Sequence, residues 1–172
     1  TDNQRGEMSF GLVQLGQASA SLGEGELAYH CLRHLVNRFW LSNMASTHNH
    51  RALFNTDISG GMPSVIIRLL VSSSLGHIRL LPALPAAWPT GSIEGILCHG
   101  GIVVKRLHWK GNRIEVELSS TRGQVVTLVL TSPIADFKGE KVNLTHLAGF
   151  NQLSVTLQAD QVASLQITLQ TT

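Results

Sequence analysis

The sequence predicts a mixed fold in which helices come first and antiparallel strands follow. Up to about residue 76, apolar side chains recur at three- and four-residue steps, which is typical of helices. Beyond Gly101, apolar and polar residues alternate, which is typical of strands with one wet face. Three prolines punctuate the stretch between 82 and 89. The chain is therefore expected to divide into a helical segment, 1–76, and a β domain, 77–172.

Two helices are expected near the start of the chain, at 9–22 and 24–39. The first carries apolar residues with small residues between them, which favours close packing on its neighbours, and Gly23 ends it. In the second, Leu27, Ala28, Cys31, Leu32, Leu35, Val36 and Phe39 form one apolar stripe. Glu24 and Glu26 lie in its first turn, where the helix dipole favours negative charge.

A third helix is expected at 62–74, after the loop that contains Asp57. Pro63 suits the first turn of a helix, where its missing N–H is not needed. Arg68 is the only charged residue over the next two turns, so this helix is apolar nearly all round and other helices should enclose it. Three helices are too few to do so, which predicts that further helices of the same polypeptide, or another copy, pack on this segment.

A long polar segment separates the second and third helices, from Trp40 to Asn55. Loops of this kind often hold function, so His50 and Asn55 are candidate substrate-binding residues. The His-x-His spacing of His48 and His50 is compatible with a metal. A third ligand is not indicated, so neither a metal site nor a cofactor is predicted.

The β domain is expected to be an antiparallel meander or sandwich. Its first strand is predicted at 77–81, and later strands alternate cleanly, as Ile114, Val116 and Leu118 do with the charged residues between them. Gly111-Asn112 and Arg122-Gly123 are turn signals of the hairpin type. Trp88 and Trp109 are expected to pack at the domain junction or in the core.

Composition narrows the classes of partner. The 172 residues are 43% apolar and only 14% charged, and the net charge of +2 is spread without a Lys/Arg cluster, so neither nucleic acid nor an anionic membrane is indicated. No apolar run is long enough to span a bilayer. Cys31 and Cys98 lie far apart in different kinds of segment, which gives a disulfide no support. The chain begins with Thr and its first helix follows almost at once, which predicts a processed or truncated piece of something longer.

Four successive stretches resemble motifs near the C-terminus of glycoside hydrolase family 95. They are Leu-Gly-Glu-Gly-Glu-Leu-Ala-Tyr (22–29), the stretch 54–70, Leu-Leu-Pro-Ala-Leu-Pro-Ala-Ala-Trp-Pro (80–89), and Gly-Ile-Leu-Cys-His-Gly-Gly (95–101) followed by Trp109. The resemblance covers roughly 8–120. It implies that the helical segment is the end of an (α/α)6 catalytic barrel and that the tail is a β-sandwich-like domain. It also implies an inverting exo-glycosidase that removes terminal α-L-fucosyl or α-L-galactosyl residues from glycans, secreted or periplasmic.

By this resemblance, Asp57 is a catalytic residue that supports activation of the attacking water. The general-acid Glu and the Asn pair of such enzymes have no counterpart here, so the 172 residues alone should be inactive. The same segment departs from the family pattern: after Asp57 the chain reads Ile-Ser-Gly-Gly-Met where the family typically reads Gly-Asn-Phe-Gly-Gly. From the residues alone, a role in bracing its own loop is favoured over a catalytic role for Asp57. Two other interpretations therefore stay open, a non-catalytic carbohydrate-binding module and a structural remnant without sugar chemistry.

Overall fold

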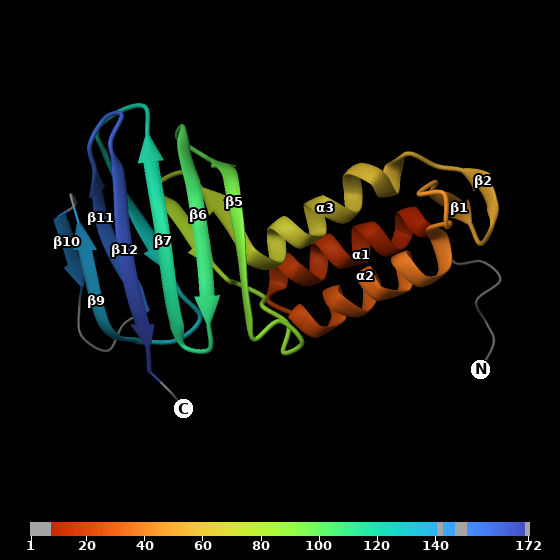
Figure 1. Ribbon diagram of the computed structural model, residues 1–172, viewed down its shortest axis with the longest axis horizontal. Coiled ribbons are helices and arrows are strands. Elements are labelled where there is room, and N and C mark those ends of the chain that lie inside the picture. The colour runs from red at the N-terminus through yellow and green to blue at the C-terminus, as the bar shows by residue number, and fades with distance from the viewer. Residues whose placement is uncertain (1–7, 141–142, 147–150, 171–172) are drawn as a thin grey trace. The chain divides into compact units, whose positions relative to one another are not determined.

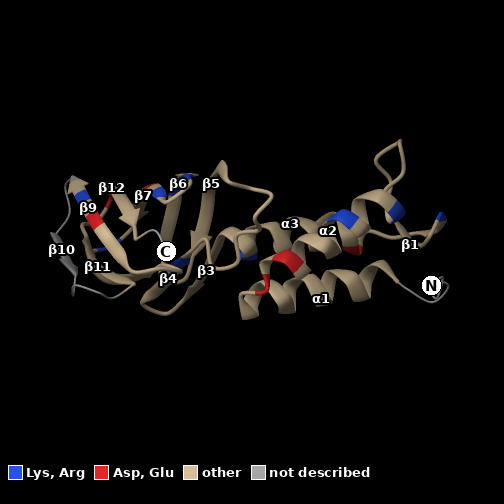
Figure 2. Cartoon of the chain, turned by 90° about the horizontal axis from the view of Figure 1, so that it is seen from below, with Lys and Arg blue, Asp and Glu red and all other residues tan. Residues whose placement is uncertain are grey.

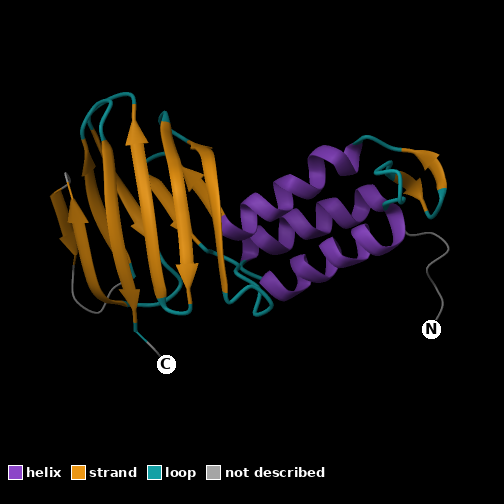
Figure 3. Cartoon of the chain, viewed as in Figure 1, coloured by secondary structure: helices purple, strands orange, loops and turns teal. Residues whose placement is uncertain are grey.

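The computed structural model describes residues 8–140, 143–146 and 151–170. The chain forms two compact units, coloured by secondary structure in Figure 3. The helical unit comprises Thr1–Leu69 with Ala83–Pro85, and the β unit comprises Leu70–Pro82 with Ala86–Thr172.

The described part of the helical unit forms three helices and a small hairpin (Figure 1). The helices are α1 (Ser9–Leu22), α2 (Gly25–Phe39) and α3 (Asp57–Leu70), and the hairpin strands are β1 (Thr47–Asn49) and β2 (Ala52–Phe54). The sequence prediction of the first two helices is confirmed. Gly23 ends α1 in the left-handed conformation, with its N–H bonded to the Ala20 carbonyl. The polar segment after α2 was expected to be a loop and instead folds into the β1–β2 hairpin.

The prediction for the third helix is wrong at both ends. Helix α3 begins at Asp57 and ends at Leu70, and residues Val71–Ser74 form strand β3. Pro63 therefore lies inside the helix, where it cannot donate a backbone hydrogen bond to the carbonyl four residues earlier. The burial of Ile58 outweighs this local cost in free energy. Ile58 lies in the first turn of α3 and is completely buried. Nor is α3 enclosed on all sides, since Ile66 and Ile67 are half-buried and Arg68 is exposed.

Helices α1 and α3 approach each other closely through glycines. A Cβ added to Gly61 would lie 2.5 Å from Val13 Cγ1, and one added to Gly16 would lie 3.2 Å from both methyl groups of Val65. Beside these contacts, Gln17 Nε2 donates to Ser64 Oγ at 3.0 Å. The adjoining apolar cluster draws on all three helices and consists of Leu12, Val13, Cys31, Leu35, Phe39 and Ile58.

Two stretches that lie far apart in the sequence meet at the start of α2. A Cβ on Gly25 would collide with the carbonyl oxygen of Ala83, so only glycine permits this approach. The backbone N–H of Ala83 in turn donates to the Leu69 carbonyl at 3.2 Å. The stretch Gly23–Gly25 and residues Ala83–Pro85 of the proline-rich stretch thus form one packed corner of the helical unit.

The described residues of the β unit form two five-stranded sheets, seen as two layers in Figure 1. The first has the order β10-β11-β8-β4-β3. Its strands are β3 (Val71–Ser74), β4 (His77–Leu80), β8 (Gln124–Val129), β10 (Asn143–His146) and β11 (Gln152–Leu157). The second has the order β5-β6-β7-β12-β9. Its strands are β5 (Thr90–Cys98), β6 (Ile102–Lys110), β7 (Arg113–Ser120), β9 (Ile134–Glu140) and β12 (Val162–Leu169).

Strand pairing in these sheets is antiparallel, except that β4 runs parallel to β8. The turn at Gly111-Asn112 joins the antiparallel strands β6 and β7, as predicted. The hairpin expected at Arg122-Gly123 is wrong, because β7 and β8 belong to different sheets. There Ser120 Oγ donates to the Arg122 carbonyl at 2.7 Å and accepts from Gln124 Nε2, which stabilises a crossing between the sheets.

Each sheet buries one face, as the alternating sequence pattern predicted. Ile114, Val116 and Leu118 of β7 are at most 1% exposed, whereas Arg113 and Glu115 are exposed. Trp109 is also buried, and its Nε1 donates to the Trp88 carbonyl at 2.9 Å. Both cysteines are buried, and no disulfide joins them. None of the helices in the described part of the chain has the length and apolar character needed to cross a membrane.

Candidate functional site

The backbone around Asn55 is fixed by the end of the β1–β2 hairpin. Its N–H donates to the Ser46 carbonyl at 2.9 Å, and Ser46 Oγ donates to the Asn55 carbonyl. Thr47 Oγ1 ties the other strand to α2 by donating to the Phe39 carbonyl at 3.2 Å. Asn55 itself is only 8% exposed. Its side chain therefore leaves the hairpin in one defined position.

The Asn55 side chain links the hairpin to the start of α3. Its Oδ1 accepts from the backbone N–H of Asp57, and its Nδ2 lies 3.0 Å from His48 Nδ1. Because a backbone N–H can only donate, the amide oxygen must face Asp57 and the amide nitrogen must face His48. His48 Nδ1 is then the acceptor, which requires the neutral imidazole.

Asp57 is the first residue of α3, where the positive end of the helix dipole favours a carboxylate. The sequence expectation placed Asp57 in a loop; in the structure it is helical, and its side chain is exposed. The reason is its neighbour Ile58, whose burial in the apolar cluster draws this turn into the helix and leaves Asp57 on the outer side. Among the described residues, no basic side chain forms an ion pair with Asp57. The backbone of Asp57 is thus fixed by its hydrogen bond to Asn55, and its carboxylate is exposed to solvent.

Among the described residues, His50 forms no hydrogen bond with Asn55, Asp57 or His48. Its Nδ1 lies 2.8 Å from the Arg38 carbonyl, which can only accept, so Nδ1 is protonated and Nε2 remains available. His48 and His50 thus form hydrogen bonds with different partners, Asn55 and the Arg38 carbonyl. Within the described ranges, no three His, Cys, Asp or Glu side chains are grouped in a way that could hold a metal ion.

His50 lines a polar pocket of about 520 Å³ in the helical unit. Its lining also includes Asn37 and Arg38 at the end of α2, the segment from Trp40 to Asn43, and Arg51. Sequence reasoning selected His50 but not Trp40 or Arg51. Arg51 has a left-handed φ of 54° in the hairpin turn, and a sequence pattern does not reveal such a conformation.

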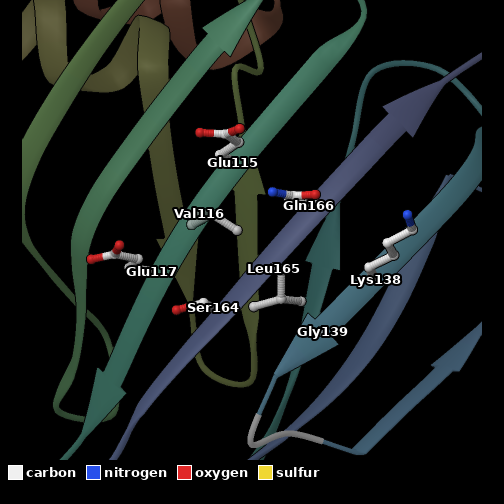
Figure 4. A pocket seen from close by; sticks show the side chains of 8 residues that line it. All are labelled: Glu115, Val116, Glu117, Lys138, Gly139, Ser164, Leu165 and Gln166. Carbon is white, nitrogen blue, oxygen red and sulfur yellow. The ribbon is translucent and has the colours of Figure 1, made fainter.

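A second concavity lies on the outer face of the sheet β7-β12-β9, with a volume of about 270 Å³ (Figure 4). Its polar side chains come from successive strands: Glu115 and Glu117 from β7, Ser164 and Gln166 from β12, and Lys138 from β9. Glu115 also lies 3.6 Å from His108 Nδ1. None of the residues lining it is aromatic. It therefore lacks the flat ring expected of a carbohydrate-binding sheet face.

Comparison with known proteins bears directly on the β unit. Residues 72–167 match the model of the glycoside hydrolase family 95 C-terminal domain, which is more than half of the chain. The chain belongs to glycoside hydrolase family 95. This match begins within β3 and runs into β12, so it includes both sheets.

A curated relative extends the similarity to family 95 beyond that domain. The chain is 31% identical over 134 residues to "Alpha-L-fucosidase 2" of Arabidopsis thaliana, covering 70% of this chain and 16% of that protein. The chain thus spans about one sixth of the length of this relative. Among solved structures, a glycoside hydrolase family 30 subfamily 8 xylanase, Xyn30A of Clostridium acetobutylicum, aligns with a TM-score of 0.37 and 7% identity. The alignment covers 95% of this chain and 40% of that one, and similarity at this level carries no argument.

Proposed function

We propose that this chain is the C-terminal part of an inverting exo-glycosidase that hydrolyses terminal α-L-fucosyl or α-L-galactosyl residues of glycans. Membership of family 95 and the similarity to an α-L-fucosidase support the substrate class. The structural observation that carries the proposal is Asp57, an exposed carboxylate whose backbone is held by the buried Asn55. In this proposal, 1–76 forms the end of an (α/α)6 barrel and 77–172 its C-terminal β domain.

Inversion requires two carboxyl groups with a water between one of them and the sugar. One group protonates the departing glycosidic oxygen, and the other helps to remove a proton from the attacking water. In this proposal Asp57 belongs to the water side, because its side chain is exposed at the start of α3, where a water can approach it. The general acid would come from a preceding part of the polypeptide.

Asn55 has a positioning role in the proposed site. The Asn55 side-chain amide accepts a hydrogen bond from the Asp57 backbone N–H, and the Asn55 backbone is hydrogen-bonded to Ser46 of the hairpin segment. The backbone that carries the Asp57 carboxylate is therefore fixed to the hairpin. Rigid placement matters because a displacement of about 1 Å can cost on the order of 100-fold in rate. In this proposal Asn55 supports catalysis through Asp57.

We further propose that other helices of the same polypeptide cover the helical unit. Several large apolar side chains of α1 and α2 are exposed, although side chains of this kind are usually buried. They are Phe10, Leu15, Leu22, Leu27 and Val36. A large exposed apolar patch is uncommon on a soluble monomer and usually marks a surface that another protein segment covers. The length of the curated relative, of which this chain matches 16%, leaves ample polypeptide to supply the cover.

The deciding experiment uses a longer polypeptide that contains this chain and the upstream catalytic groups. It should hydrolyse an aryl α-L-fucoside or α-L-galactoside with inversion, as followed by proton NMR of the first-formed anomer. Asp57→Asn should reduce turnover by roughly 100- to 10,000-fold, with nearly unchanged thermal stability. Asp136→Asn, at an exposed residue of β9, is the matched control and should retain turnover.

Two results would contradict the proposal. Normal turnover by the Asp57→Asn enzyme would reduce Asp57 to a residue that braces its own segment, and turnover by the 172 residues alone would place the active site elsewhere. Lack of any glycosidase activity in the longer polypeptide would instead support a structural remnant.

A further inference from the structure

The His48 side chain connects three segments of the helical unit. It belongs to strand β1, and its Nδ1 lies 3.0 Å from Asn55 Nδ2, just before α3. Its Nε2 lies 3.1 Å from the sulfur of Met8, the residue that precedes α1. Figure 2 shows the start of α1 and strand β1 at the same end of the helical unit. The imidazole ring therefore lies between the start of one helix and the hairpin that leads into another.

The direction of each hydrogen bond in this chain follows from the atoms at its two ends. The Asp57 N–H can only donate, so it occupies Asn55 Oδ1 and leaves the Asn55 Nδ2 hydrogens to face His48 Nδ1. At the other end, the thioether sulfur of Met8 can only accept, so His48 Nε2 must carry the proton. The two ends thus require the same neutral tautomer of His48 independently of each other.

This tautomer of His48 fixes the orientation of the Asn55 amide. If the amide oxygen and nitrogen of Asn55 exchanged places, two donors would meet at the Asp57 N–H and two acceptors would meet at His48 Nδ1. Asn55 is only 8% exposed, so these mismatches would cost the free energy of unsatisfied buried groups. His48 therefore holds Asn55 in the one orientation that accepts from the Asp57 backbone.

We propose that His48 is a positioning residue for the carboxylate that activates the attacking water. Its neutral ring orients the Asn55 amide, and that amide holds the backbone of Asp57. The effect on turnover rests on the proposed glycosidase function, while the chain of hydrogen bonds stands without it. Because His48 acts on Asp57 through Asn55, it requires no contact with the sugar.

The tautomer can be tested in the 172-residue chain without any activity. Long-range proton–nitrogen correlation spectra distinguish an imidazole protonated on Nε2 from one protonated on Nδ1, at a pH where the ring is neutral. His48 should carry its proton on Nε2. His50 is the internal control, because its Nδ1 donates to the Arg38 carbonyl and it should show the opposite tautomer. A His48 ring that is protonated on Nδ1, or that exchanges between both forms, would overturn the inference.

Two substitutions separate the two nitrogens of the His48 ring. His48→Asn places an amide oxygen near the position of Nδ1 and can still accept from Asn55, whereas His48→Gln places its amide near the position of Nε2 and loses that acceptor. In the longer polypeptide, His48→Gln should lower kcat by roughly 10- to 100-fold, as expected for a displacement of up to about 1 Å. KM should not change, because the lost support acts in the transition state. His48→Asn should restore most of the turnover.

A double-mutant cycle tests whether His48 acts through Asn55. Adding His48→Gln to Asn55→Ala should cost no further turnover, because the intermediary has already been removed. Additive losses would contradict this route. His30→Gln, at an exposed residue of α2, is the matched control and should leave turnover unchanged. Should His48→Gln fail to fold, the tautomer of the unmodified chain and the turnover of His48→Asn still decide.

Normal kcat in the His48→Gln enzyme would overturn the inference, and so would a higher KM at unchanged kcat, which would assign His48 to sugar binding. In the 172-residue chain, the Asp57 amide should exchange its hydrogen faster in His48→Gln than in His48→Asn; equal rates would contradict the chain of hydrogen bonds.

These failures remain distinguishable from failure of the proposed function. An enzyme that loses turnover on Asp57→Asn but not on His48→Gln refutes only the role of His48. Conversely, a longer polypeptide that hydrolyses no fucoside or galactoside, although the tautomer and the amide exchange are as expected, refutes the glycosidase while the chain of hydrogen bonds from His48 to Asp57 stands.

Discussion

Gly61 of α3 and Val13 of α1 lie so close that no side chain fits between them: a Cβ on Gly61 would be 2.5 Å from one Val13 methyl carbon and 3.0 Å from the other. Val13 is 5% exposed and β-branched, so it has little freedom to turn away. Gly61→Ala should therefore destabilise the chain by about 1–3 kcal/mol in urea denaturation.

The neighbouring glycine provides the control. A Cβ on Gly60 would meet nothing within 4 Å, so Gly60→Ala should stabilise α3 by up to about 1 kcal/mol through helix propensity. Equal effects of the two substitutions would mean that α1 and α3 are not in contact at Gly61.

The link from Asn55 to Asp57 can be measured apart from catalysis. Asn55→Ala removes a buried acceptor and donor together, and the unfolding free energy should fall by about 1–3 kcal/mol. The amide of Asp57 should also exchange its hydrogen faster in NMR, because its acceptor is lost. Thr56→Ala, at the exposed residue between them, should change neither quantity. Unaltered exchange in the Asn55 variant would show that Asp57 is held by other means.

Cys98 should make stability depend on pH in the alkaline range. Burial raises the pKa of its thiol above the ordinary 9.0, and a hydrogen bond with Ser73 partly opposes this. Because the unfolded thiol ionises first, its contribution to stability is full below pH 9.0 and declines as the pH rises further. In a Cys31→Ala background, Cys98 should react with iodoacetamide far more slowly at pH 8.5 when folded than in urea. Equal rates would contradict the burial.

The exposed apolar side chains of the helical unit should make the isolated 172 residues self-associate. Leu15 and Leu22 lie two turns apart on one side of α1 and are 45% and 80% exposed. Light scattering should detect species larger than a monomer, and a Leu15→Glu/Leu22→Glu double variant should shift them toward monomer. Leu97→Glu, at a 74% exposed position in the β unit, is the control and should not. A monodisperse unmodified monomer would count against the proposed covering helices.

The local pattern of apolar residues predicted an element correctly wherever burial of one face alone determined its structure. Most of the apolar stripe of α2 and the alternating apolar residues of β7 form buried faces, so both elements were predicted correctly, although Leu27 and Val36 of the stripe are exposed. Helix α3 was misplaced because two forces compete in it. Gly60, Gly61 and Pro63 disfavour a helix locally, while contact with Val13 and burial of Ile58 favour one, and that packing is visible only in three dimensions.

The candidate site likewise contains residues that the sequence indicated and residues that only the three-dimensional structure reveals. Asp57 and Asn55 were selected from the sequence and are joined in the structure, whereas His48 was considered only as a metal ligand and proves to be the other partner of Asn55. Trp40 and Arg51 gave no signal, because their pocket depends on a hairpin turn with an unusual backbone conformation. Turns that rely on positive φ at residues other than glycine are not encoded by a recognisable pattern.

The order of the strands has a consequence for how the β unit is made. Strand β8 pairs with β4, which precedes it by about 50 residues, and with β11, which follows it, while β12 pairs on both sides, with β7 and β9. Neither sheet can therefore close until its late strands have left the ribosome. Until then Ile78 and Leu80, fully buried in the finished sheet, remain open to solvent. Pairing over such separations slows folding, so the nascent β unit should spend an extended time as a target for chaperones.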